Sequence, residues 1–103
     1  MITPSRDAAA LKEDLCRALL SPKDAAGMAA LLADLCTPAE IRTLAERWHV
    51  AQLLAGTKMS YRDIHDATGV STTTIVRVAR FLNGEPHGGY RQVLARIGDA
   101  DAR

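Results

Sequence analysis

The chain of 103 residues is long enough for one domain and too short for two. Hydrophobic residues make up 48% of the sequence, which excludes a disordered chain, and the low aromatic content of 4% favours helices over strands. The formal net charge of +1 identifies no partner by itself, although the middle of the chain, over 37–82, is its basic part.

Targeting and metal-binding signals are not visible in the sequence. Residues 1–10 contain Arg6 and Asp7 and lack the apolar core of a signal peptide, and no apolar run approaches the roughly 20 residues of a membrane span. Cys16 and Cys36 have no Cys or His partners at metal-ligand spacing, so we expect free, buried thiols. The sequence therefore predicts a cytoplasmic protein with no metal and no other cofactor.

Two helices with proline near their starts are predicted first. A Thr-Pro pair is expected to open a helix over 3–20. Ser21 and Pro22 then form a typical helix start, with serine as the cap and proline at the first helical position, which predicts a second helix over 22–35.

A third, longer helix is predicted from a capping box. The sequence Thr-Pro-Ala-Glu over 37–40 provides the box, and Gly56 closes the helix about 18 residues later. Its expected apolar face consists of residues spaced by three or four, namely Ile41, Leu44, Ala45, Trp48, Ala51 and Leu54. The three helices offer more leucine and alanine than one small domain needs, so we expect 1–56 to be a dimerisation scaffold that two copies of the chain bury together.

The segment 57–83 predicts a helix-turn-helix. Ser60, with Asp63 three residues on, caps a short helix that stops at Gly69, and Ser71 caps a second helix that runs to about residue 83. Glycine is needed at the turn because it adopts the left-handed backbone conformation freely. Val70 should plug the junction between the two helices. Their small core is expected to consist of Ile64, Ala67, Ile75 and Val78.

The outward face of the second helix predicts a DNA contact, because such a helix presents its first residues to base edges in the major groove. Thr73 and Arg77 are expected to contact bases, and Lys58 and Arg62 to contact phosphates. His65 falls where such motifs carry a small residue, so either the helices cross more widely or the ring points to the DNA backbone. The full set of candidate DNA-binding residues is Lys58, Ser60, Arg62, His65, Ser71, Thr72, Thr73, Thr74, Val76, Arg77 and Arg80.

A last helix is predicted within 84–98, after a stretch of glycines and a proline. The amphipathic segment 90–97 carries Val93, Leu94 and Ile97 at helical spacing. The expected architecture is thus one all-α domain over 1–103, with six helices and no strand.

Helix pairs joined by a glycine turn also occur in bundles that never bind nucleic acid. The alternative is therefore a helical protein–protein interaction module that does not bind DNA. No nucleophile lies in a catalytic pattern and there is no phosphate-binding loop, so we expect that the protein is not an enzyme.

From Leu35 to about Ile97 the chain resembles the Trp repressor family, and in particular its Trp-repressor-related YerC/YecD branch. The resemblance implies a six-helix subunit that intertwines with a second copy, and transcriptional repression at a palindrome-like DNA operator. The matching positions are 35–40, Arg47, 53–56, Met59, Ser60, Arg62, Ile64, Gly69, Thr74, Ile75 and Arg77.

The ligand pocket of the family is matched only in part by this sequence. In the founding member of the family an indole lies between two arginines, which Arg47 and Arg77 match. A glycine that opens that pocket is Val78 here, and a serine that meets the ligand is Phe81. We expect Val78 and Phe81 to fill the space, so tryptophan is not the expected co-repressor, and the sequence identifies no other small effector.

Overall fold

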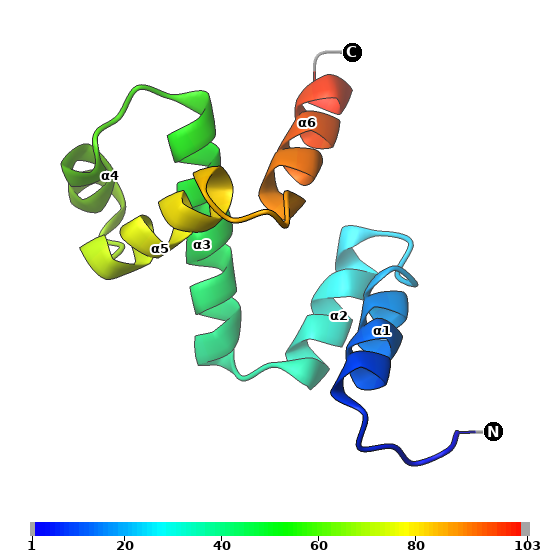
Figure 1. The fold of residues 1–103 in the computed structure, drawn as a ribbon. Coiled ribbons are helices and arrows are strands. Elements are labelled where there is room, and N and C mark those ends of the chain that lie inside the picture. The colour runs from blue at the N-terminus through cyan, green and yellow to red at the C-terminus, as the bar shows by residue number, and fades with distance from the viewer. Residues whose placement is uncertain (1, 102–103) are drawn as a thin grey trace. The chain divides into compact units, whose positions relative to one another are not determined.

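The computed structural model describes residues 2–101, which form six α-helices and no strand (Figure 1). Contacts divide the chain into two compact units, 1–41 and 42–103, so the boundary falls within the third helix. The helices are α1 (Ala8–Leu19), α2 (Ala25–Leu35), α3 (Pro38–Gly56), α4 (Tyr61–Thr68), α5 (Thr72–Asn83) and α6 (Gly89–Asp101). The predicted all-α fold with six helices is confirmed for these residues.

The helices α1 and α2 begin later than predicted, because aspartates cap them. The carboxylate of Asp7 accepts a hydrogen bond from the amide two residues on, at 3.1 Å, and the residues before it are not helical. The carboxylate of Asp24 accepts from the Gly27 amide at 2.7 Å, so α2 starts after Asp24 and not at Pro22. A carboxylate also complements the positive end of the helix dipole, which favours aspartate as the cap.

In the unit 1–41, neither α1 nor α2 buries a residue. Leu11, Leu15 and Leu35 remain 52%, 42% and 50% exposed. Both cysteines are free, as predicted, but Cys16 is exposed and Cys36 is only half-buried, so the expected burial of the two thiols is wrong. The apolar residues of these helices thus find no core of their own.

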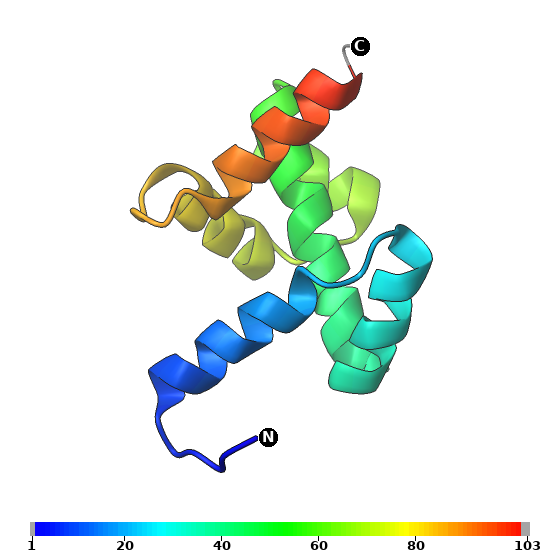
Figure 2. The ribbon, with the colours of Figure 1, turned by 90° about the vertical axis from the view of Figure 1, so that its right-hand side faces the viewer.

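The helix α3 begins at the predicted capping box and is continuous to Gly56 (Figure 2). The Thr37 amide donates to the Glu40 carboxylate at 2.8 Å, and the Glu40 amide donates to the Thr37 hydroxyl at 3.1 Å. Two backbone N–H groups at the helix start are thereby satisfied by side chains of the first turn.

The core lies in the unit 42–103, where α3, α4 and α5 meet. Its largest fully buried side chains are Val50, Ile64, Ile75 and Val78, and each contributes about 2 kcal/mol through removal of apolar surface from water. The buried cluster consists of Val50, Ala51, Ile64, Val70, Ile75 and Val78.

The apolar face predicted for α3 is only partly the face that this core buries. Val50 lies outside the predicted face but is fully buried, next to the buried Ala51. Leu44 is 47% exposed and Ala45 is also exposed, because α4 and α5 cover a different side of the helix. Within the unit, α3 therefore carries a covered apolar surface and an uncovered one.

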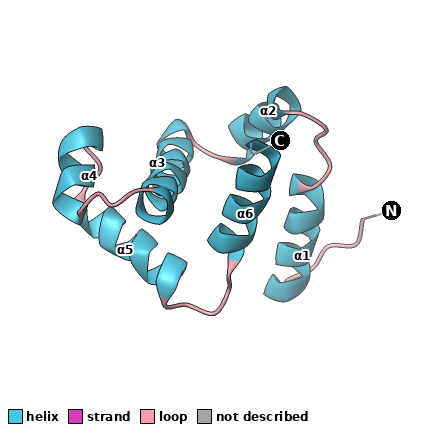
Figure 3. Ribbon diagram, turned by 90° about the horizontal axis from the view of Figure 1, so that it is seen from above, coloured by secondary structure: helices cyan, strands magenta, loops and turns pink. Residues whose placement is uncertain are grey.

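The order of contacts in the second unit places α5 between α4 and α6 (Figure 3). Arg91 of α6 fastens the end of α5: its Nε donates to the Leu82 carbonyl at 3.3 Å and its Nη2 to Asn83 Oδ1 at 2.6 Å. The helix α6 is longer than the predicted segment 90–97. No helix among residues 2–101 is both long and apolar enough to cross a membrane.

Candidate nucleic-acid interface

The helices α4 and α5 form the predicted helix-turn-helix. The Ser60 hydroxyl accepts from the Asp63 amide at 3.0 Å, while Asp63 Oδ2 accepts from the Ser60 amide at 3.1 Å. Gly69 ends α4 with φ 74°, in the left-handed region that the turn requires. The Ser71 hydroxyl then accepts from the Thr74 amide at 3.2 Å and starts α5.

Two hydrogen bonds and the burial of Val70 hold the turn between α4 and α5. Val70 is 4% exposed, as predicted for the junction, and its amide donates to the Thr68 hydroxyl at 3.1 Å. His65 Nδ1 donates to the Val70 carbonyl at 2.8 Å, so the imidazole ring is tied to the turn. This contact explains how a large residue is accommodated beside the crossing. Ala67, predicted to join the small core, is exposed instead.

The outward face of α5 begins with an exposed pair of threonines. Thr72 and Thr73 are exposed, and Val76, one turn further on, is 52% exposed. Thr74 differs, because it is half-buried and its hydroxyl accepts from the Ser71 hydroxyl at 3.0 Å. The hydroxyls of Ser71 and Thr74 are thus used within the helix cap, and those of Thr72 and Thr73 are the ones at the surface.

The residues expected to contact phosphates lie at the start of the motif. Lys58 and Arg62 are exposed on either side of the Ser60 cap. Ser60 itself uses its hydroxyl and its amide within the capping box. The phosphate contacts of Lys58 and Arg62 stay predictions. Both side chains are exposed and can be reached by a phosphate.

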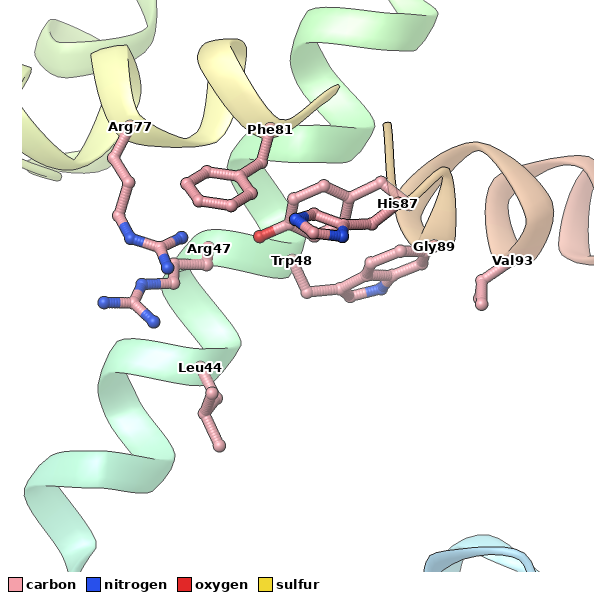
Figure 4. Close-up of a pocket in the computed structure, with 9 residues that line it drawn as sticks. Leu44, Arg47, Trp48, Arg77, Phe81, His87, Gly89 and Val93 are labelled. Atoms are coloured by element: carbon pink, nitrogen blue, oxygen red, sulfur yellow. The ribbon is translucent and has the colours of Figure 1, made fainter. Parts of the chain in front are cut away.

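The two arginines of α5 have different surroundings. The guanidinium carbon of Arg77 lies 4.5 Å from the centre of the Phe81 ring, and the side chain points toward a pocket that it shares with Arg47 (Figure 4). Arg80 is paired with Glu85, at 2.8 Å between Nη2 and Oε1. Arg80 thus stays on the exposed side of the helix, and the predicted base contact of Arg77 would require its side chain to leave Phe81.

The pocket beside Arg77 has a volume of about 520 Å³ and lies between α3, α5 and the start of α6. Trp48 and Tyr90 stack in it, with ring centres 6.4 Å apart and planes at 28°, and Phe81 stacks on His87 at 5.9 Å and 14°. The lining residues are Leu44, Arg47, Trp48, Arg77, Phe81, His87, Gly89, Tyr90 and Val93.

The space that we expected Val78 and Phe81 to fill is arranged differently. Val78 is fully buried in the core and does not line the pocket, whereas Phe81 forms part of its wall. Nε of Arg47 is buried without a hydrogen-bond partner. The arginines expected from the resemblance, Arg47 and Arg77, are thus brought together at a cavity with aromatic walls.

Sequence reasoning missed Glu85, His87 and Tyr90 as parts of this region. The glycines and proline of 84–89 indicated only a break between helices, yet the turn returns its side chains to α5. Trp48, expected on the apolar face of the third helix, is half-buried and stacks on Tyr90. Among residues 2–98, whose side chains are described, no group of histidines, cysteines and carboxylates could hold a metal ion.

Two short capped helices joined by a glycine turn, with a polar face exposed on the second, define a helix-turn-helix protein. The family model described as Trp repressor protein matches residues 11–97. The chain belongs to the Trp repressor family. This family consists of regulatory DNA-binding proteins and not of enzymes, in agreement with the expectation from the sequence.

Individual relatives match this chain over most of their length. YerC of Bacillus subtilis is 37% identical over 89 residues, which cover 86% of this chain and 84% of YerC. A crystal structure of a TrpR-like protein from Eubacterium eligens superposes with a TM-score of 0.79 at 40% identity, over 86% of this chain and 90% of that one. The crystal structure of a candidate Trp repressor from Staphylococcus aureus superposes with a TM-score of 0.78 at 34% identity, over 89% of each chain.

Proposed function

We propose that this protein is a sequence-specific transcriptional regulator, acting as a repressor and as a homodimer in the cytoplasm. The observation that carries the proposal is the exposed face of α5, which presents Thr72, Thr73, Val76 and Arg80 after a helix start capped by Ser71. A helix of this width fits the major groove of B-form DNA, whose width is about 12 Å.

The chemistry of this face suits base edges. A threonine hydroxyl can bond a base or a phosphate, and its methyl group, like the side chain of Val76, can contact a thymine methyl. Exposed cations at Lys58 and Arg62 would fix the motif on the phosphates, which give affinity without sequence preference. Recognition is then divided between a reading helix and its basic flank.

Dimerisation is supported by the apolar surface that each unit leaves uncovered. In 1–41, α1 and α2 bury no residue, and in 42–103 Leu44, Val93 and Ile97 are 47%, 45% and 42% exposed. A second copy of the chain would cover such surfaces by symmetry and would place two reading helices about one DNA turn apart. We therefore propose 1–56 as the dimerisation scaffold, 57–83 as the reading head and 84–98 as the helix that fastens it.

We also propose that operator binding does not require tryptophan. A planar ligand between the two arginines would stack on the guanidinium group of Arg77, and the Phe81 ring already lies 4.5 Å from that group. The reading head thus carries its own aromatic contact at the place where a ligand would supply one. The pocket of about 520 Å³ leaves room for another small molecule, whose identity stays open.

The test is a selection of bound duplexes from a random-sequence pool at low salt, followed by affinity measurements over a range of salt concentrations. A DNA-binding regulator should enrich a sequence with two related half-sites, and the logarithm of its affinity should fall linearly with the logarithm of salt. A pool that stays random would favour the alternative, an interaction module whose polar face is only solvated.

A further inference from the structure

Glu85 binds the guanidinium group of Arg80 along one edge. Its Nε donates to Glu85 Oε1 at 3.0 Å, and its Nη2 lies 2.8 Å from the same oxygen. These two atoms form the side edge of the guanidinium group. The end edge, made of Nη1 and the second proton of Nη2, is left for another acceptor, and the Arg80 side chain is 71% exposed.

The turn after α5 holds the Glu85 carboxylate in place beside Arg80. The amides of Gly84 and Glu85 both donate to the Arg80 carbonyl, at 2.7 Å and 3.1 Å. A Cβ atom at position 84 would lie 3.1 Å from that oxygen, so glycine permits the close approach. The Glu85 side chain is only 25% exposed. Arg80 is therefore bound to Glu85 through its backbone and its side chain together.

The Phe81 ring restrains the same guanidinium group from another direction. Its centre lies 5.8 Å from the guanidinium carbon of Arg80, and His87 stacks on the ring. A long arginine side chain otherwise loses considerable conformational entropy on binding. With the group already oriented, less of this entropy remains to be lost when its end edge forks onto a guanine or a phosphate.

We propose that Glu85 is a positioning and specificity-determining residue for DNA recognition, because it aims the end edge of Arg80 at the groove. This inference rests on the proposed function. Glu85 adds a second effect, since its negative charge lies beside the DNA-facing side of α5 and repels phosphates. It therefore penalises complexes held by backbone charge alone, while the operator complex gains from an Arg80 that is already in place.

The experiment compares the duplex most enriched in the selection with a scrambled duplex of the same length and composition. Glu85→Gln should lower the ratio of the two affinities roughly three- to tenfold, with the scrambled duplex bound as tightly as before or more tightly. Glu85→Asp keeps the charge but is one methylene shorter, so it should weaken operator binding and leave the scrambled duplex unchanged. Glu13→Gln removes the same charge from an exposed pair with Arg17 and should leave the ratio unchanged.

A double-mutant cycle with Arg80→Ala shows whether Glu85 acts through Arg80. In that background Glu85→Gln should no longer change the affinity ratio. An unchanged ratio for Glu85→Gln in the wild-type background, or an equal fall with and without Arg80, would overturn the proposal. If the wild-type protein prefers no duplex at all, the proposed function fails instead, and the two failures are thereby distinguished.

Discussion

At the scale of single residues, Arg77 and Arg80 lie only three residues apart on α5 but have different surroundings. Arg77 lies against Phe81 and the pocket, and Arg80 is held by Glu85 on the exposed side. Thr73 shares the exposed side with Arg80. Substitutions of the two arginines of α5 should therefore affect DNA binding differently.

Replacing Thr73 by alanine should change base preference at particular operator positions, at a cost of about 1–3 kcal/mol for a genuine base contact. Arg62→Ala should instead weaken binding to all duplexes alike and reduce the salt slope by about one. Titrations with the operator and with single-base variants of it measure both effects. Equal weakening of every duplex by Thr73→Ala would remove this residue from base recognition.

The carboxylate of Glu40 should make the start of α3 sensitive to acid. The Thr37 amide that donates to the carboxylate, and secondly the Thr37 hydroxyl, lower the pKa of Glu40 below its usual value. Because the folded-state pKa is the lower one, the carboxylate stabilises the fold above the unfolded-chain pKa of about 4.3. This stabilisation is lost as the pH falls through the folded-state value.

Glu40→Gln should accordingly destabilise the protein at pH 7 and have a smaller effect at pH 3. Denaturant unfolding at several pH values measures the difference in free energy. Thr37→Val removes only the hydroxyl, the smaller of the two causes, so this variant should keep most of the pH dependence. If the free energy of unfolding fell equally between pH 7 and pH 3 in Glu40→Gln and in wild type, the assigned role of Glu40 would be contradicted.

At the scale of elements, the turn between α4 and α5 depends on one glycine and one plug. Gly69 has φ 74°, and a Cβ atom built there meets nothing within 4 Å. The cost of a side chain at this position is therefore backbone strain and not a collision. Val70 then enters the core and ties the two helices together.

Gly69→Ala should lower the free energy of unfolding by about 1–2 kcal/mol, the cost of the left-handed conformation for an L-residue. Gly98→Ala is the matched control, because Gly98 lies within α6 with open space around its missing Cβ atom. The control should leave stability unchanged or raise it, since alanine favours helices by up to about 1 kcal/mol over glycine. Equal stability of Gly69→Ala and wild type would contradict the role of this turn.

At the scale of the whole molecule, the uncovered apolar surfaces of the two units favour a second copy of the chain. Light scattering at micromolar concentration should give twice the mass of 11.1 kDa. Leu15→Ser should weaken this dimer, because Leu15 is an exposed apolar residue of α1, whereas Lys12→Ser on the same helix should have little effect. A monomeric wild type would contradict the assembly.

Tryptophan should change neither the dimer nor its operator affinity. Calorimetry with the free amino acid should show no binding heat, because Phe81 occupies the contact on Arg77. A ligand shifts an equilibrium only through different affinities for the two states, so an absent binding heat should accompany an unchanged operator affinity. A tenfold gain in affinity on adding tryptophan would show that Phe81 moves aside.

The sequence determined most of the parts of the protein that depend on residues within four positions of each other. The starts of α1 and α2 are exceptions, because Asp7 and Asp24 cap these helices later than the sequence predicts. The capping boxes at 37–40 and 60–63, the Ser71 cap and the turn at Gly69 are all found where the sequence predicts them. The all-α class and the helix-turn-helix follow from these local signals, since each one is a hydrogen bond or a backbone conformation set by neighbouring residues.

Only the tertiary structure decided which surfaces those helices use. It buries Val50 in place of Leu44 on α3, and it returns Glu85 to Arg80 through the turn after α5. It also joins Arg77 to a pocket with aromatic walls. Helical periodicity states which residues share a face, but the packing of other helices selects the face that becomes core, because burial is set by contacts between segments distant in the chain.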